Sequence, residues 1–403
     1  MTIDVIVTSF VVLLLLALVA QPIAQWIRLP YATSLVMVGF IVSELLVMSG
    51  VDTGIRADNF QQLIFYVLLP VLIFQSAYSI DKVKLRQNLF PILFLSIAGM
   101  MLTCGLIAVG LYYGIAHAAG FPWAAALLTG AILAATDPVS VVSSLKEVGA
   151  PKRLSILLEG ESLFNDATAI VVFSIFLSMA LSSSATIDAV DAVIRFITVF
   201  LGGAVIGVVM GYCAVKIKRL SNEKTFIGVL SIFLAYSSFL VAEKFHVSGV
   251  MATLLAAVIM SSASSKTESY DDGGLWDVIG HMANAIVFIV MGVTITIGMF
   301  EDRWLAMLIA IGAVLVARAI SIYAGLFVIS KMQQDPIKLK SQSVMVWGGL
   351  RGAVTLALAL SLPTTLDYWW TIQSIAFGVV VFSLFVQAPT IKLLVDALHI
   401  KKT

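Results

Sequence analysis

Residues 124–145 read AAALLTGAILAATDPVSVVSSL, an apolar run with the length of a membrane helix that contains Pro138 in its middle. Proline removes a backbone hydrogen bond and pushes the residue before it, Asp137, out of the helical conformation. Backbone groups freed inside a bilayer need other partners, so such breaks persist only beside protein or a wet cavity. This stretch therefore predicts a membrane helix that is interrupted at a carboxylate.

The composition places the whole chain in a lipid environment. Of its 403 residues, 60% are apolar and 12% are charged, whereas a soluble domain carries about 25% charged residues. Uncharged runs of about 20 residues are long enough to cross the hydrocarbon as helices. The net charge of +1 gives no sign of a nucleic-acid partner. We therefore expect an all-α membrane protein whose main partner is the lipid bilayer.

Hydrophobic runs predict thirteen membrane segments, at residues 3–20, 31–49, 59–78, 89–114, 122–147, 154–182, 189–215, 225–243, 246–262, 275–300, 303–330, 341–362 and 369–397. The loop charges agree with this number. With the C-terminus in the cytoplasm, 18 of the 24 basic residues lie on the cytoplasmic side and only Arg56, Lys244 and Arg303 lie outside. The remaining three fall within segments: Arg195, Arg318 and Arg351. Basic residues concentrate in cytoplasmic loops, so we expect the N-terminus outside and the C-terminus inside.

A second interrupted segment, residues 343–363, reads SVMVWGGLRGAVTLALALSLP, and three glycines loosen its backbone around Arg351. Either break alone could be an ordinary kink of a membrane helix. The two segments are the fifth and the twelfth, so they cross the membrane in opposite directions. Interrupted helices at matching positions of two inverted halves indicate a secondary transporter with a site at the membrane midplane.

Two carboxylates are expected near that site. The sixth segment, which contains LEGESLFNDATAIVVF at residues 158–173, follows the fifth after a short loop and should pack antiparallel to it. Asp137 lies nine residues before Lys146, or about 13 Å along a helix, and Asp166 lies thirteen residues after Arg153, or about 20 Å. Both carboxylates therefore fall near the middle of the membrane.

Neighbouring carboxylates away from water do not both stay ionised, so one of them holds a proton unless a cation replaces it. That competition is the core of an exchange mechanism. Ser162 lies on the same helix face as Asp166, and Thr136 can add a hydroxyl or a carbonyl freed by Pro138. Hard oxygen ligands of this kind suit Na⁺, Li⁺ or K⁺. The chain has no Gly-rich phosphate loop, so we expect neither a cofactor nor an enzyme activity.

Charged residues in the membrane need partners. Glu161 is expected to form a structural ion pair with Arg351 of the other broken segment. Arg318, in VARAISIY at residues 316–323, is expected to neutralise remaining negative charge or to bind carbonyls freed by the breaks.

These motifs resemble those of a known family. ATDPVSVVSSLKEVGAPKRLSILLEGESLFNDATAIVVF, residues 135–173, is similar to the paired signature of monovalent cation/proton antiporters of the NhaP and eukaryotic sodium/proton exchanger type. VWGGLRGAV, residues 346–354, resembles their broken twelfth helix, and HVSGVMATLLAAVIM, residues 246–260, resembles their ninth. The similarity runs through nearly the whole chain.

The resemblance implies one antiporter membrane domain over residues 1–403, with thirteen helices in two inverted repeats and broken helices 5 and 12 that cross. Helices 4–6 and 11–13, at about 89–182 and 303–397, would form a mobile core. Helices 1–3 and 7–10, at about 3–78 and 189–300, would hold a homodimer together. Alternating access by the core would exchange a cation, Na⁺ before Li⁺ or K⁺, for a proton across a bacterial or archaeal cell membrane.

The resemblance also implies roles for the site residues. Asp166 would bind cation and proton in turn, and Asp137, the Thr136 backbone and Ser162 would complete the site. Asn165 would hold the crossing of the broken helices. An asparagine before the aspartate implies electroneutral exchange of one proton for each cation.

The sequence departs from the family pattern at Gln75, in FYVLLPVLIFQSAYSID at residues 65–81. The family usually has an acidic residue at this position. Gln75 can offer a carbonyl oxygen as a ligand but no charge, which leaves the choice between Na⁺ and K⁺ open.

Two functions of other classes use similar residues. An intramembrane aspartyl protease also needs two membrane carboxylates, although neither aspartate here lies in a GxGD sequence. A cation channel could use the same acidic site without coupling to protons, in which case flux would not respond to a pH gradient.

Overall fold

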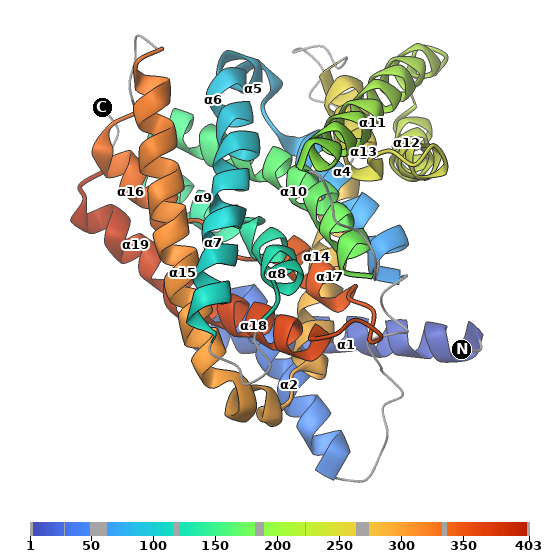
Figure 1. Cartoon of the computed structure of the whole chain (residues 1–403). Coiled ribbons are helices and arrows are strands. Elements are labelled where there is room, and N and C mark those ends of the chain that lie inside the picture. Colours follow the sequence, from blue (N-terminus) through green and yellow to red (C-terminus); the bar gives the residue numbers. More distant parts are fainter. Residues whose placement is uncertain are drawn as a thin grey trace.

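The computed structural model describes residues 3–27, 29–48, 63–115, 121–181, 189–221, 223–262, 274–332 and 337–400, and every regular element among them is a helix (Figure 1). Three π-helical stretches, η1, η2 and η3, continue directly into α-helices. The elements are α1 (Ile3–Ile27), α2 (Tyr31–Met48), η1 (Ile64–Leu68), α4 (Leu69–Ser79), α5 (Lys82–Gln87), α6 (Leu89–Phe94), η2 (Leu95–Gly99), α7 (Met100–Gly114), α8 (Trp123–Ala134), α9 (Val139–Glu147), α10 (Lys152–Leu181), α11 (Ala189–Lys218), α12 (Lys224–Lys244), α13 (Gly249–Ser262), α14 (Leu275–Thr294), α15 (Ile297–Ser330), α16 (Leu339–Trp347), α17 (Ala353–Leu360), α18 (Trp369–Phe382), η3 (Ser383–Gln387) and α19 (Ala388–Ala397).

Eight helical stretches of the described chain are long and apolar enough to cross a membrane: Phe10–Ile27, Leu89–Gly114, Lys152–Leu181, Val190–Lys218, Lys224–Lys244, Leu275–Thr294, Ile297–Ser330 and Trp369–Ala397. Four shorter apolar helices accompany them: Tyr31–Leu46, Ile64–Ser79, Trp123–Ala134 and Gly249–Ser262. A multi-pass membrane protein with an all-helical fold follows from these lengths. The number of thirteen crossings and the inverted repeat remain predictions, because length and composition do not decide whether each short helix crosses.

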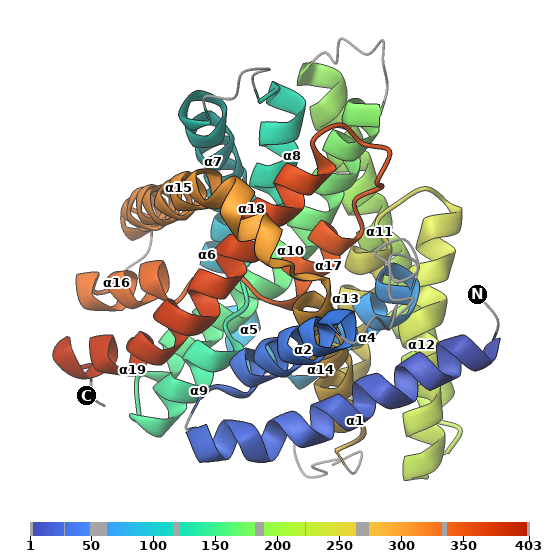
Figure 2. The ribbon, with the colours of Figure 1, turned by 90° about the horizontal axis from the view of Figure 1, so that it is seen from below.

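The helices pack in two groups that face each other (Figures 1 and 2). In one group α11, α12 and α13 pack together, α13 contacts α4, and α14 packs on α1, α2 and α4. In the other group α7 packs on α8 and α15, and α18 packs on α15 and α17. The long helix α10 contacts α8 on one side and α11 and α13 on the other. The helix that carries Asp166 therefore lies where the two groups meet.

Both segments with helix-breaking residues are interrupted. α8 ends at Ala134 and α9 begins at Val139, so the gap falls at residues 135–138 around Pro138. α16 ends at Trp347 and α17 begins at Ala353, with the gap at residues 348–352. The gaps meet, because the Asp137 backbone N–H donates to the Leu350 carbonyl at 2.8 Å.

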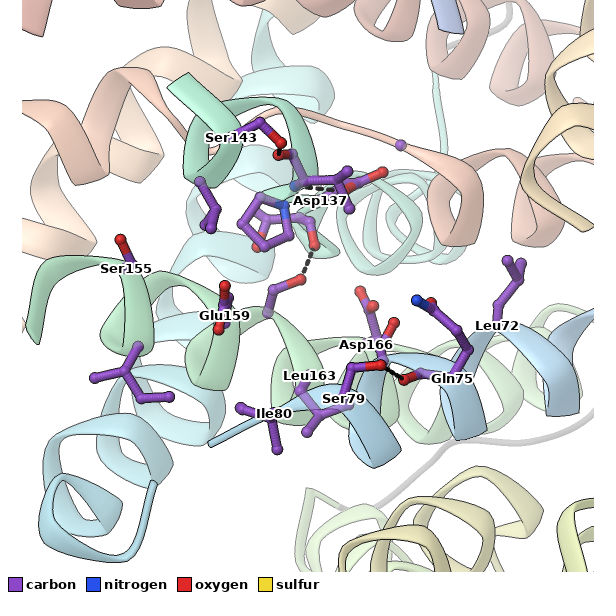
Figure 3. Close-up of a pocket in the computed structure, with 18 of the residues that line it drawn as sticks. Leu72, Gln75, Ser79, Ile80, Asp137, Ser143, Ser155, Glu159, Leu163 and Asp166 are labelled. Atoms are coloured by element: carbon purple, nitrogen blue, oxygen red, sulfur yellow. Dashed lines mark hydrogen bonds between the residues drawn. The ribbon is translucent and has the colours of Figure 1, made fainter. Parts of the chain in front are cut away.

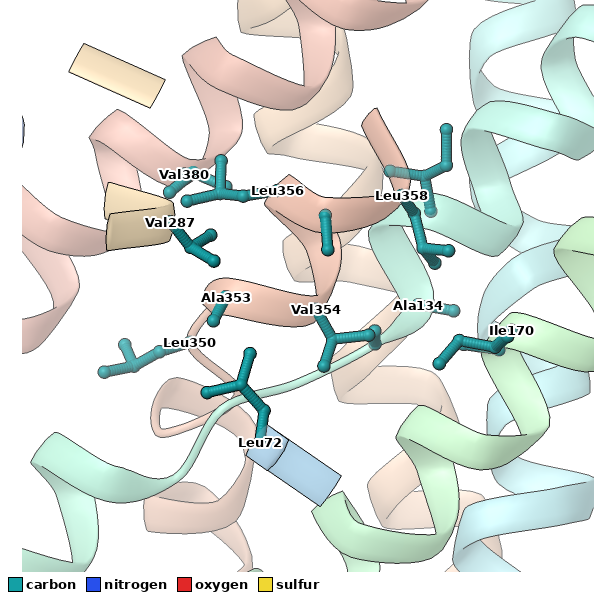
Figure 4. Close-up of a cluster of buried hydrophobic side chains, with 14 of the residues drawn as sticks. Leu72, Ala134, Ile170, Val287, Leu350, Ala353, Val354, Leu356, Leu358 and Val380 are labelled. Atoms are coloured by element: carbon teal, nitrogen blue, oxygen red, sulfur yellow. The ribbon is translucent and has the colours of Figure 1, made fainter. Parts of the chain in front are cut away.

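Close backbone approach and apolar packing hold this crossing. A Cβ at Gly352 would collide with the Asp137 carboxylate, so only glycine fits there. Apolar side chains from several helices surround the two gaps (Figure 4), and the buried ones shown include Leu72, Ala134, Ile170, Val287, Leu350, Ala353, Val354, Leu356, Leu358 and Val380. Polar groups at the crossing are thus confined between apolar walls and must find partners among themselves.

Candidate functional site

A cavity of about 700 Å³ opens beside the crossing. It is lined by α4, α5, α9, α10, α14, α17 and the gap at 135–138, and it contains both expected carboxylates (Figure 3). The structure brings together, along this one cavity, five of the residues that the sequence singled out: Gln75, Thr136, Asp137, Ser162 and Asp166.

Asp166 lies on a continuous stripe of α10 that faces the cavity. Ser155, Glu159, Ser162 and Asp166 line it at spacings of four, three and four residues, which is one face of a helix. The Oδ1 atom of Asp166 is buried and has no hydrogen-bond partner among the described residues. A buried carboxylate oxygen without a donor is unfavourable, so this atom is available to a cation or to a proton.

The end of α8 is tied to α10 by two neighbours of Asp166. The Ser162 hydroxyl donates a short hydrogen bond to the Thr136 carbonyl. The Asn165 side-chain amide donates to the Ala134 carbonyl at 3.0 Å and to the Thr136 hydroxyl at 3.2 Å. Asn165 thus contacts the crossing, as expected, and the oxygen atoms of Thr136 and Ser162 lie against each other beside the cavity.

Asp137 is held by backbone donors. Its Oδ1 accepts from the Val139 backbone N–H at 3.0 Å, which places the carboxylate at the first turn of α9. The Ala353 backbone N–H, at the start of α17, also hydrogen-bonds to this carboxylate. Helix N-termini carry partial positive charge, so two of them stabilise an ionised Asp137 where water is scarce.

The partner of Glu161 is a different arginine from the one expected. Glu161 pairs with Arg318, whose two terminal nitrogens donate to the two carboxylate oxygens at 2.5 and 2.7 Å. Both side chains are buried, with exposed fractions of 2% and 6%. The expected pair of Glu161 with Arg351 is therefore wrong: a fork-to-fork contact satisfies both Glu161 oxygens at once, and Arg318 supplies it from α15.

Arg351 instead binds carbonyls that the first break sets free. One of its terminal nitrogens donates to the Ala134 carbonyl at 2.9 Å and to the Ala135 carbonyl at 2.8 Å. These carbonyls end α8, where the helix dipole places negative charge. Arg318 thus takes the first of the two roles expected for it, the neutralisation of negative charge, and it also reaches the Met345 carbonyl of α16 at 3.4 Å. Most contacts with loosened carbonyls are made by Arg351.

Gln75 extends from α4 into the same space as the Asp166 carboxylate (Figure 3). Its backbone carbonyl accepts from the Ser79 hydroxyl at 2.9 Å, and its side chain lines the cavity. The position thus suits the ligand role that the sequence left open.

Several lining residues were missed by the sequence reasoning. At the mouth of the cavity Lys146 of α9 and Glu159 of α10 form an ion pair at 3.3 Å. Glu159 precedes Asp166 by seven residues, or two helical turns, so its position was readable from the sequence. Asn284 of α14 also lines the cavity, but nothing in the sequence near it indicated that it would face a helix more than a hundred residues away.

The ligand chemistry of the cavity is that of oxygen atoms. No group of three His, Cys, Asp or Glu side chains in the described part of the chain could hold a metal ion together. Carboxylate, carbonyl, hydroxyl and amide oxygens suit a hard cation of low charge.

Comparison with known proteins agrees with these features. The model of the family described as "Sodium/hydrogen exchanger, transmembrane" matches residues 11–397. The Na⁺/H⁺ antiporter ApNhaP of Aphanothece halophytica is 36% identical over 92% of this chain and 70% of its own length. The Na⁺/H⁺ antiporter NhaG of Bacillus atrophaeus is 36% identical over 98% and 75%, and the Na⁺/H⁺ antiporter NhaP of Pseudomonas aeruginosa is 32% identical over 93% and 92%.

A solved structure has the same fold. The sodium proton antiporter MjNhaP1 from Methanocaldococcus jannaschii matches with a TM-score of 0.80 over 97% of this chain and 98% of the other, at 22% identity.

Proposed function

This chain belongs to the sodium/hydrogen exchanger family, whose members are transporters rather than enzymes, and on that premise we propose that it exchanges Na⁺ for a proton at Asp166. Family membership agrees with the resemblance inferred from the motifs at residues 135–173 and 346–354. The observation that carries the proposal is the buried, unpartnered Oδ1 of Asp166 beside a cavity of about 700 Å³.

Competition for one carboxylate supplies the coupling. When Asp166 is protonated, its charge is gone and a cation gains little by binding. When Na⁺ binds, the carboxylate must be ionised, so the proton leaves. The unfavourable state inside the membrane is an ionised carboxylate with no cation bound. Movement of the site across the membrane is therefore favoured only with one cargo or the other.

Exchange of one proton for each cation follows from the unequal surroundings of the two aspartates. Asp137 accepts hydrogen bonds from the N-terminal ends of α9 and α17, and we propose that these donors keep it in one protonation state through the cycle. Only Asp166 then changes its protonation during a cycle. The net charge that crosses is zero, so exchange should be electroneutral. Li⁺ and K⁺ meet the same oxygen ligands, and we propose them as weaker competitors of Na⁺.

The two groups of helices fit a division of labour. We assign the mobile core to residues 89–182 and 303–397, which contain both breaks and Asp166. Residues 3–78 and 189–300 form the part that holds a homodimer in the bilayer. Alternating access then comes from movement of the core relative to the dimer part, with the N-terminus outside and the C-terminus in the cytoplasm. The ion gradients drive the cycle, so no cofactor is needed.

Reconstituted protein tests the function directly. Purified wild type and Asp166→Asn are placed in liposomes that carry a pH gradient, and proton flux is followed on addition of Na⁺, Li⁺ or K⁺ with and without a clamped voltage. Wild type should dissipate the gradient only with a cation present and without voltage dependence, and Asp166→Asn should be inactive.

Exchange by Asp166→Asn at the wild-type rate would contradict the assignment of Asp166. Cation flux through wild type that ignores the pH gradient would instead identify a channel. Cleavage of a helical substrate by the purified protein would identify an intramembrane protease.

A further inference from the structure

The cavity has a second polar wall, which two neutral amides form. Gln75 of α4 and Asn284 of α14 both line the cavity and are partly buried. Within the described ranges, neither side-chain amide has a hydrogen-bond partner in the protein. α4 and α14 pack on each other, in the helix group that faces the breaks. This wall therefore comes from a different part of the fold from the stripe that carries Asp166.

Packing places Gln75 and Asn284 on neighbouring turns of this wall. Gly280 precedes Asn284 by four residues and so lies on the same face of α14. A Cβ at Gly280 would lie only 2.6 Å from Cγ and 2.9 Å from Cδ of Gln75. Because Gly280 has no side chain, Gln75 can lie directly on α14, one turn from Asn284.

Three polar groups thus meet one cavity without a partner among the described residues: the two amides and the Oδ1 of Asp166. Of the three, the Asp166 Oδ1 is buried, and a buried carboxylate oxygen without a donor is unfavourable. A cation among two amide oxygens and one carboxylate oxygen would satisfy all three. Amide oxygens bind a cation by their dipoles, so they tune the field around the ion without adding a group that takes up protons.

We propose that Asn284, acting with Gln75, is a specificity-determining residue of the cation site. Its amide oxygen completes the coordination of the ion held at Asp166 and sets the preference among Na⁺, Li⁺ and K⁺. This inference rests on the proposed exchange at Asp166. A carboxylate at position 284 would raise the field strength, which favours the small ions that hold their ligands most tightly, and would add a second protonatable group.

The experiment compares wild type, Asn284→Ala, Asn284→Asp and the control Thr294→Ala in liposomes. Initial exchange rates are measured against the concentrations of Na⁺, Li⁺ and K⁺. Asn284→Ala should raise the KM for the preferred cation on the order of tenfold, change the Na⁺-to-K⁺ ratio and keep most of the maximal rate. Asn284→Asp should shift preference towards Li⁺ and Na⁺. Thr294→Ala should match wild type, because the Thr294 hydroxyl donates to its own helix, at the Val290 carbonyl, at 2.7 Å.

Unchanged KM values and cation ratios in both Asn284 variants would overturn the inference. An equal fall in maximal rate for all three cations, with KM unchanged, would also overturn it, because that pattern reports loss of packing. Failure of wild type to exchange any cation would remove the proposed exchange and this inference together. If wild type exchanges cations and the Asn284 variants keep its KM values and cation ratios, only the role inferred for Asn284 is overturned.

Discussion

Asp137 and Asp166 line one cavity, yet among the described residues backbone donors hydrogen-bond to the first carboxylate and not to the second. Asp137 stands in a broken segment, where the Val139 backbone N–H donates to it at 3.0 Å and the Ala353 N–H also bonds to it. Asp166 stands in the middle of the continuous helix α10, whose backbone donors are used within the helix. No donor in the described part of the chain reaches its Oδ1. The local backbone therefore holds the Asp137 carboxylate and leaves the Asp166 carboxylate without a donor, and this difference supports the exchange proposed at Asp166.

Charges at the crossing extend the same comparison. Arg351 enters from the second break and binds the carbonyls that end α8, and Asp137 enters from the first break and binds the amides that begin α9 and α17. Each break therefore places a charged side chain at helix ends of opposite partial charge: Arg351 at a C-terminal end and Asp137 at two N-terminal ends. The buried Glu161–Arg318 pair balances itself nearby. Asp166 is the acidic group of the region that nothing in the described protein balances.

The largest expected effect concerns that self-balanced pair. Glu161→Ala should lower the free energy of unfolding by about 3–5 kcal/mol, because Arg318 is left charged and buried without its partner. Thermal or denaturant unfolding in detergent measures this change. Glu159→Ala is the matched control: Glu159 lies two residues away on α10 and pairs with the mostly exposed Lys146. The control should lose about 1 kcal/mol or less. Equal losses in the two variants would mean that burial of the pair does not matter.

A smaller effect separates charge from capping at Asp137. Asp137→Ala removes the side-chain oxygen at the start of α9 and should cost about 1–2 kcal/mol of stability. Asp137→Asn keeps a cap oxygen and should fold nearly as well as wild type, since asparagine caps helices as effectively. Both variants should raise the KM for Na⁺, because both lose the negative charge near the ion. If Asp137→Asn unfolds as readily as Asp137→Ala, capping is not what holds Asp137.

The smallest effect comes from a carboxylate that caps a helix in water. Asp81 accepts from the Lys84 backbone N–H at 3.2 Å and pairs with the Lys84 ammonium at 2.6 Å. The hydrogen bond from Lys84 holds the pKa of Asp81 below its usual value. The stabilisation of the folded protein by ionised Asp81 is therefore present at pH values above the unfolded pKa of about 3.9. It is lost as pH falls through the lower folded pKa.

Asp81→Ala should accordingly lower the free energy of unfolding by about 1 kcal/mol or less at neutral pH. In acid the variant and wild type should be equally stable. Unfolding curves of wild type and variant at a series of pH values measure this. A deficit that grows as pH falls would contradict the sign of the effect.

The positions of the two breaks could be read from the sequence because local rules decide them. Pro138 and the glycines around Arg351 interrupt helices wherever those helices lie. The spacing of four residues places Ser162 and Asp166 on one face of a helix, and this shared face was enough to predict a cluster of oxygen ligands. Gln75 was reached only through the family resemblance, which identified the position as unusual.

The partners of the buried charges could not be read in the same way. Arg318, on α15, and Arg351, in the gap between α16 and α17, are both buried and distant in sequence from Glu161. Spacing says nothing about how these segments are rotated against α10. The sequence therefore predicted Arg351 as the partner of Glu161, whereas the structure has Arg318. Asn284 was missed for the same reason: it reaches the cavity through the packing of α14 on α4, which Gly280 permits.

Proton release on cation binding tests the exchange at Asp166 most directly. Purified protein in weakly buffered detergent solution receives Na⁺, and the protons released are counted with a pH indicator. Wild type should release about one proton per chain, because the carboxylate must be ionised to bind the cation. Asp137→Asn should still release protons at higher Na⁺, and Asp166→Asn should release none. Proton release by Asp166→Asn in the wild-type amount would contradict competition of cation and proton at Asp166.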